Sequence, residues 1–97
     1  MKDQEKQPRY GRVRSPAEIG ELCRRERARR GLTLTDLYET TGLTTRFLSE
    51  FERGKENASI GRVLRTLESL GLDVIVLPRA QAESVLRERT APSTEES

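Results

Sequence analysis

Two pairs of polar side chains, one helical turn apart, are the part of this sequence best suited to recognising another molecule. Thr45 and Arg46 open a predicted helix, and Ser49 and Glu50 follow one turn later. The planar guanidinium of arginine fits the edge of guanine. Glu50 is suited either to accept a hydrogen bond from the N4 amino group of cytosine or to hold Arg46 by an ion pair. These residue types could therefore reach base edges from the start of a helix, and the alternative is a merely solvated first helical turn.

The residue inventory argues against catalysis. The sequence has no histidine and one cysteine, Cys23, which excludes histidine-based triads, the common zinc sites and an internal disulfide. We therefore expect no enzyme, no cofactor and no metal, and we interpret Cys23 as a small buried hydrophobe rather than a redox sensor. Arginine is the dominant basic residue, and its planar fork permits contact with phosphate or guanine.

Charge is unevenly distributed along the 97 residues, whose net charge is only +2. Residues 9–30 hold eight arginines against three glutamates, whereas residues 66–97 hold three arginines against six acids. Such a split suits a chain that meets a polyanion with one part, although solvated helix charges are the alternative. No apolar run approaches the roughly 18 residues of a membrane span and no secretory signal is present, so we expect a cytoplasmic protein without membrane contact.

Four short helices are expected to position these side chains within residues 15–71. Each predicted helix begins at a serine or threonine cap, and the caps are Ser15, Thr33, Thr44 and Ser59. A capping box between Ser15 and Glu18 is predicted for the first helix. The residues expected to face the core are Ile19, Leu22, Cys23, Leu34, Leu37, Tyr38, Phe47, Leu48, Phe51, Ile60, Val63, Leu64, Leu67 and Leu70. Residues 1–14 are interpreted as a flexible basic arm.

One segment after the helices has the pattern of a strand, because it is β-branched and ends at Pro78. Its apolar residues are Leu72, Val74, Ile75, Val76 and Leu77. A lone strand lacks backbone partners, so we predict that residues 72–78 pair with the same segment of a second copy. The alternative is an extended tail packed along its own helices. Residues 79–97 are expected to form a polar, partly disordered tail with a brief helix near 82–89.

The segments GLT at residues 31–33, GLTT at 42–45 and ERGK at 52–55 carry a family resemblance. The chain resembles the Cro/C1-type (XRE) helix-turn-helix family. Continued through ASIGRVLRTLESLGLDVIVL at residues 58–77, it is similar to the HipB-type antitoxins. The resemblance implies a mainly α fold: a domain of four to five helices over residues 15–71, then one C-terminal strand that forms an intermolecular ribbon in a homodimer.

The resemblance also implies a function and partners. It implies a sequence-specific DNA-binding antitoxin that represses its own type II toxin-antitoxin operon and binds a HipA-like serine/threonine kinase toxin. The DNA partner would be a pseudo-palindromic double-stranded operator, which implies a bacterial cytoplasmic protein that lies on the nucleoid when bound. The alternatives are a stand-alone repressor of this family without a toxin, and a protein-interaction module that has lost DNA binding.

Specific residues take roles in this interpretation. The expected base-reading residues are Thr45, Arg46, Ser49 and Glu50, which match the base-reading positions of the family. The expected phosphate contacts, through hydroxyl, backbone N–H or cationic groups, are Thr33, Leu34, Thr44, Arg53 and Lys55. Arg27 and Glu52 correspond to an internal ion pair in phage-repressor members of the family.

Three residues depart from the family's pattern. Leu34 replaces a polar phosphate-contacting residue, so only its backbone N–H is left for that contact. Tyr38 replaces a small alanine, and we expect its ring to be partly buried with the hydroxyl in water. Thr41 is more polar than the family's usual residue at the buried turn.

Overall fold

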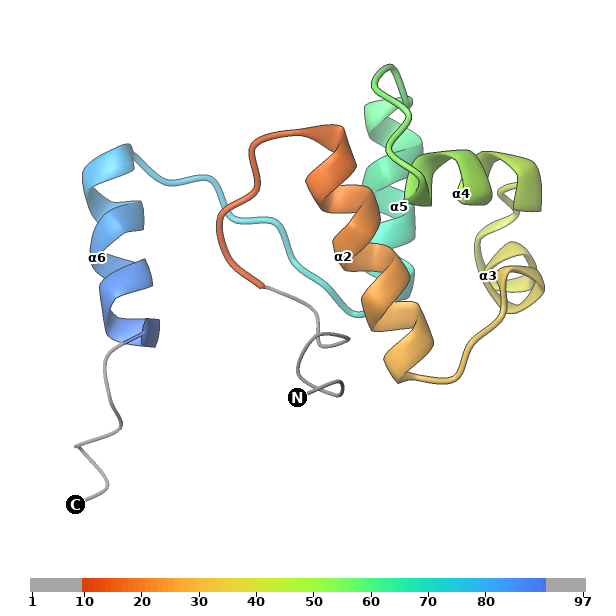
Figure 1. Cartoon of the computed structure of the whole chain (residues 1–97), viewed down its shortest axis with the longest axis horizontal. Coiled ribbons are helices and arrows are strands. Elements are labelled where there is room, and N and C mark those ends of the chain that lie inside the picture. The colour runs from red at the N-terminus through yellow and green to blue at the C-terminus, as the bar shows by residue number, and fades with distance from the viewer. Residues whose placement is uncertain (1–9, 91–97) are drawn as a thin grey trace.

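The computed structural model describes residues 10–90, and within that range the chain folds into five α-helices (Figure 1). They are α2 (Pro16–Arg29), α3 (Leu34–Thr41), α4 (Thr45–Glu52), α5 (Ile60–Ser69) and α6 (Arg79–Thr90). The predicted mainly α, four-to-five-helix fold is therefore confirmed. None of these described helices is long and apolar enough to cross a membrane. The parts of the predicted arm and tail formed by residues 1–9 and 91–97 lie outside the described residues.

Helix starts follow the predicted caps. The side-chain oxygens of Ser15, Thr33, Thr44 and Ser59 each accept a hydrogen bond from a backbone N–H in the first turn of the following helix. The predicted capping box at Ser15 is wrong in one detail, because the Glu18 carboxylate accepts from the backbone N–H of Arg14 instead. The full capping box occurs at the start of α3, between Thr33 and Asp36.

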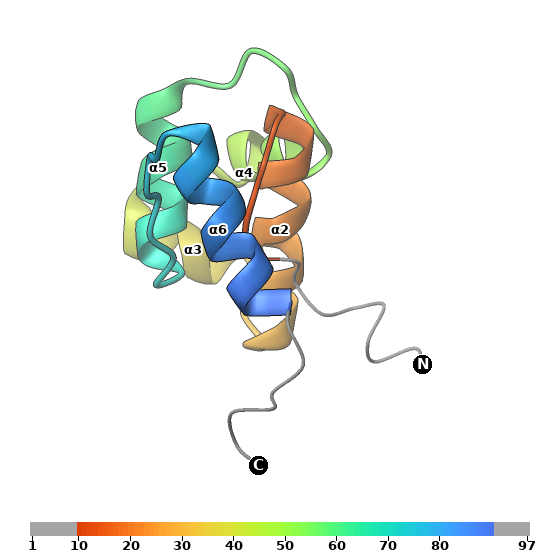
Figure 2. The same cartoon turned by 90° about the vertical axis from the view of Figure 1, so that its left-hand side faces the viewer.

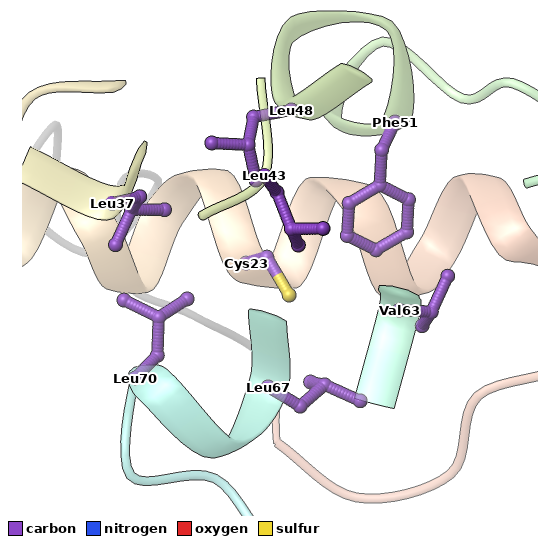
Figure 3. Packing of buried hydrophobic residues seen from close by; sticks show 8 residues of the cluster. All are labelled: Cys23, Leu37, Leu43, Leu48, Phe51, Val63, Leu67 and Leu70. Atoms are coloured by element: carbon purple, nitrogen blue, oxygen red, sulfur yellow. The ribbon is translucent and has the colours of Figure 1, made fainter. Parts of the chain in front are cut away.

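A single apolar core holds α2, α3, α4 and α5 together, and Figure 3 shows its side chains converging on Cys23 of α2. The core residues are Cys23, Leu37, Leu43, Leu48, Phe51, Val63, Leu67 and Leu70. The principal helix contacts join α2 to α4, α3 to α4 and α3 to α5. The helix that carries the predicted base-reading residues is thus fixed from two sides.

Helices α2 and α4 approach each other closely in the core. Gly20 is buried in α2, and a Cβ atom at this position would lie 2.1 Å from the carbonyl oxygen of Phe51. No side chain fits there without moving the backbone of α4. Glycine therefore sets the distance between the two helices.

Some residues predicted to face the core are exposed. On α5, the buried face consists of Val63, Thr66 and Leu67, whereas Ile60 is 68% exposed and Leu64 is 45% exposed. The apolar stripe of α5 is wider than the surface that α3 covers, so one flank stays in solvent. Tyr38 is also 49% exposed, and this half-burial agrees with the partial burial expected for it.

Residues 72–78 are extended and lead away from the four-helix unit to α6, which stands apart from it in Figure 1. Within residues 10–90 of this single chain the segment pairs with no strand. Its apolar side chains are exposed to solvent: Val74, Ile75 and Val76 are 57%, 75% and 89% exposed. Pairing with a second copy thus stays a prediction.

The described end of the N-terminal arm lies against α2. The Tyr10 hydroxyl donates to Oε1 of Glu26 at 2.5 Å, and Glu26 is almost completely buried. Arg29 and Arg30 also donate to this carboxylate. The hydrogen bond from Arg29, followed by those from Tyr10 and Arg30, lowers the pKa of Glu26 to about 2 against the opposing effect of burial. A salt-bridged buried acid thus anchors the arm.

Candidate nucleic-acid interface

The turn between α3 and α4 is a tight, fully hydrogen-bonded reversal. Gly42 adopts the left-handed conformation at φ 78°, and its N–H donates to the Tyr38 carbonyl at 2.7 Å. The Thr41 hydroxyl donates to the Leu37 carbonyl at 2.7 Å and accepts from the Leu43 N–H at 3.0 Å. This dual role explains a polar residue at the turn, because Thr41 satisfies backbone groups that a hydrophobic side chain would leave unpaired.

Helix α4 has one buried face and one open face. Leu48 and Phe51 are fully buried, and the Phe47 ring stacks on Phe51 with centroids 5.9 Å apart. On the other side, Thr45 and Arg46 are exposed in the first turn, where the Thr44 hydroxyl caps the helix. The helix therefore offers its N-terminal turn to an outside partner while its inner face is held rigidly.

A bidentate ion pair fixes the end of α4 to α2. Arg27 Nε lies 2.7 Å from Glu52 Oε2, and Arg27 Nη2 lies 2.9 Å from Glu52 Oε1. The third guanidinium nitrogen of Arg27 donates to the carbonyl of Leu32 at 2.8 Å, which ties the α2–α3 turn to the same group. The pair is mostly buried, with Glu52 only 5% exposed in its side chain. The structure thus brings together the two residues that the resemblance paired.

The predicted base-reading residues lie together on the open face of α4, but two of them already have internal partners. The Glu50 carboxylate accepts hydrogen bonds from Arg46 Nε at 3.3 Å and from Lys55 Nζ at 3.2 Å. The hydrogen bond from Arg46, then that from Lys55, holds the pKa of Glu50 below its usual range. The Arg46 side chain is still 89% exposed, so its guanidinium is accessible from solvent on the open face of α4. The contact between Glu50 and Arg46 is the geometry that one of the two roles expected for Glu50 requires, and that role stays a prediction.

Ser49 and the predicted phosphate-contacting cations form the rest of this surface. The Ser49 hydroxyl accepts from Arg53, an exposed residue that ends α4. Lys55 follows on the loop, with its N–H bonded to the Glu50 carbonyl at 3.1 Å. Arg46 and Lys55 contact the Glu50 carboxylate, and Arg53 bonds the neighbouring Ser49, so three cations and one carboxylate lie on this part of the surface. Its net charge is positive, which suits an anionic backbone.

The start of α3 supplies the remaining predicted phosphate contacts. Thr33 is exposed and caps the helix, and Asp36 closes the capping box behind it. The Leu34 side chain packs partly against the core, so only its backbone N–H can reach outward. The first N–H groups of a helix lack intrahelical partners and favour anions. The backbone N–H of Thr33 already donates to Asp36 Oδ2 at 2.8 Å, so the backbone phosphate contact predicted at this helix start is left to Leu34.

Sequence reasoning missed Arg62, which joins this surface from α5. Its guanidinium carbon lies 5.8 Å from the centroid of the Phe47 ring, at cation–π distance. Arg62 also lines a shallow hollow with Thr44, Arg46, Glu50 and Lys55. Within α5 it sits on the flank opposite Ile60 and Leu64. That position, away from the apolar stripe, was the available sequence signal.

Two further features concern metal ligands and the single cysteine. Within residues 10–90, no three histidine, cysteine, aspartate or glutamate side chains are grouped in a way that could hold a metal ion. Cys23 is fully buried, and burial, followed by the charges of Glu52 and Glu26, raises the pKa of its thiol to about 12. The thiol is therefore inert at neutral pH and acts as a core residue.

Known proteins resemble this chain in sequence and in fold. The family model described as Helix-turn-helix matches residues 24–77. The "Uncharacterized HTH-type transcriptional regulator y4mF" of Sinorhizobium fredii (strain NBRC 101917 / NGR234) is 38% identical over 66 residues, which span 68% of this chain and 87% of that protein.

Two solved structures share the fold. The HipB-O4 20mer complex has a TM-score of 0.67 and 22% identity, covering 71% of this chain and 97% of the solved chain. The HipA-HipB-O2-O3 complex has a TM-score of 0.66 and 22% identity, again covering 71% and 97%. At this identity the likeness demonstrates a common fold.

Proposed function

The chain belongs to the Cro/C1-type helix-turn-helix family of DNA-binding regulators, and from this premise we propose that it is a sequence-specific repressor that reads operator DNA with α4. The observation that carries the proposal is that α4 has one buried face and one exposed face. Its inner face is locked by Leu48, Phe51 and the Arg27–Glu52 pair, while Thr45 and Arg46 project into solvent. A rigid helix with an exposed first turn can enter the major groove and present side chains to base edges.

Each residue group has a separate task in this proposal. Arg46 binds a guanine, and Glu50, Ser49 and Thr45 restrict the neighbouring bases. Arg53, Lys55 and the start of α3 hold phosphates on either side, which gives affinity without sequence preference. Displacing Glu50 from Arg46 costs little, because the pair is exposed and its two atoms lie 3.3 Å apart.

The repressor acts as a homodimer in this proposal. Residues 72–78 form an antiparallel ribbon with the same residues of a second chain, which covers the exposed side chains of Val74, Ile75 and Val76. A two-fold axis then presents two copies of α4 about 34 Å apart, the spacing of one turn of duplex DNA. The operator is accordingly pseudo-palindromic.

The dimer additionally serves as an antitoxin that binds a HipA-like serine/threonine kinase toxin. This part is supported by the common fold with HipB as it occurs in the HipA-HipB-O2-O3 complex. A stand-alone repressor without a toxin is the second candidate, and it is favoured by the relative named as a transcriptional regulator. Co-expression with the product of the adjacent gene separates the two: a stable complex supports the antitoxin, and its absence supports the stand-alone repressor.

DNA reading is tested by comparing wild type and Arg46→Ala on a specific duplex and on a scrambled duplex of equal length. We expect Arg46→Ala to weaken specific binding by about 1 to 3 kcal/mol per half-site and to change binding to the scrambled duplex much less. Equal weakening on both duplexes would argue that Arg46 contacts only the backbone. The ribbon is tested by Val74→Pro, which removes a ladder donor and should yield monomers in sedimentation experiments.

A further inference from the structure

Helix α6 and one flank of α5 each carry apolar side chains in solvent. On α5, the exposed side chains are Ile60 and Leu64, at 68% and 45%. On α6, Ala82 and Leu86 share a face with Val85, which is 44% exposed. The whole of α6 lies beyond the residues that match the helix-turn-helix family. The helix-turn-helix match therefore assigns no role to α6.

The exposed flank of α5 faces away from the proposed DNA surface. At about 100° per residue, Ile60 and Leu64 both lie about 160° around the helix from Arg62. Arg62 in turn packs on the Phe47 ring of α4. A partner on the Ile60–Leu64 flank thus leaves the first turn of α4 open, and both surfaces can be occupied at once.

The chain connection indicates which partner covers this flank. Residues 72–78 carry α6 away from its own four-helix unit (Figure 1), and in the view of Figure 2 α6 is the helix nearest the viewer. Helix α6 takes no part in the principal helix packing. In an antiparallel ribbon centred on Ile75, the middle of the segment, residue 78 of one chain lies opposite residue 72 of the other. Neighbouring strands are about 5 Å apart, so α6 begins beside the C-terminal end of the partner's α5.

From this juxtaposition we propose that the two chains exchange α6, so that each α6 packs antiparallel along the α5 of its partner and covers the Ile60–Leu64 flank. The proposal rests on the homodimer of the proposed function and extends its interface beyond the ribbon. The occupant is a second copy of this chain, because the ribbon delivers α6 to that site without a further turn.

The lengths and levels of the two helices agree with this exchange. Helix α5 has 10 residues and α6 has 12, which correspond to about 15 Å and 18 Å. Leu64 lies six residues before Leu70, and Val85 lies six residues after Arg79. Both offsets are about 9 Å, so antiparallel packing from the shared end brings Val85 level with Leu64.

Disulfide trapping between two different full-length chains tests the exchange. One chain carries Leu64→Cys and the other Val85→Cys; they are mixed, unfolded and refolded together, and oxidised with diamide. We expect a covalent heterodimer. Ser84→Cys replaces Val85→Cys as the control, because Ser84 lies on the opposite face of α6 and should not crosslink. The native Cys23 is fully buried and should stay reduced.

Three results would overturn the exchange. The first is no heterodimer from the Leu64→Cys and Val85→Cys mixture, and the second is equal crosslinking by Ser84→Cys. The third is an intrachain disulfide in the Leu64→Cys/Val85→Cys double variant of one chain, with no interchain product. Sedimentation of wild type shows whether the protein is a dimer. It therefore separates a failure of the exchange from a failure of the proposed dimeric repressor. If wild type is a dimer that binds DNA but the Leu64→Cys and Val85→Cys mixture gives no crosslink, the exchange alone is refuted. If wild type is a monomer, the proposed dimer is refuted as well.

Discussion

The Arg27–Glu52 pair offers a quantitative prediction about what holds the DNA-reading helix in place. Arg27→Met keeps most of the aliphatic stem but removes the guanidinium, leaving the Glu52 carboxylate, only 5% exposed, without its two donors at 2.7 and 2.9 Å. Removing one partner of such a pair typically costs about 3 to 5 kcal/mol. That is a large fraction of the roughly 5 to 15 kcal/mol by which small domains are stable.

The size of the effect should depend on which partner is removed. Glu52→Gln retains the shape and one acceptor, and the Arg27 side chain is still 18% exposed and still bonded to the Leu32 carbonyl. We expect this variant to lose only about 1 to 3 kcal/mol. In the double variant Arg27→Met/Glu52→Gln the buried charge is gone, so it should be more stable than Arg27→Met alone.

Urea unfolding followed by far-UV circular dichroism, at one fixed protein concentration, measures all four proteins. The expected pattern is a coupling energy above about 1 kcal/mol between the two positions. Free energies that add within about 0.5 kcal/mol, or a double variant less stable than Arg27→Met, would refute the view that a desolvated ion pair fixes α4.

Three further predictions follow from other contacts. Gly20→Ala should destabilise the fold by about 1 to 3 kcal/mol, because its Cβ would lie 2.1 Å from the Phe51 carbonyl oxygen. The control is Gly61→Ala, whose Cβ would meet nothing nearer than 3.9 Å, and it should be neutral or stabilising in the same urea assay. The pKa of Glu26 is lowered from 4.5 to about 2, so its contribution to stability is full above about pH 4.5 and disappears as pH falls toward 2; Glu26→Gln should flatten this part of the stability–pH curve. Arg62→Gln should reduce the log–log slope of DNA affinity against salt concentration by about 0.9 if Arg62 contacts one phosphate. The control is Arg24→Gln, because Arg24 is an exposed residue of α2 that pairs with Glu21, and it should leave the slope unchanged.

The features that could be predicted from sequence are those set by neighbouring residues. Ser15, Thr33, Thr44 and Ser59 were identifiable as caps because each hydroxyl bonds an N–H within three residues of itself. The helical faces that hold Leu48, Phe51, Val63 and Leu67 followed from helical periodicity alone.

The features that escaped prediction depend on contacts between distant parts of the chain. Ile60 and Leu64 continue the apolar stripe of α5, and only the position of α3 determines that this flank is left uncovered. Gly20 is an ordinary helical glycine until α4 crosses it, and the Tyr10–Glu26 bond joins residues 16 apart in sequence. Arg62 was missed for the same reason, because its neighbour Phe47 lies on another helix.

Site selection from a pool of random DNA duplexes tests most directly whether two copies of α4 read DNA together. The full-length protein should enrich an inverted repeat whose half-site centres lie about one helical turn, or 10 to 10.5 base pairs, apart. The same selection with Arg46→Ala should lose its preference at one position in each half-site. Recovery of a single unrepeated half-site, or of no preferred sequence at all, would contradict DNA reading by paired α4 helices.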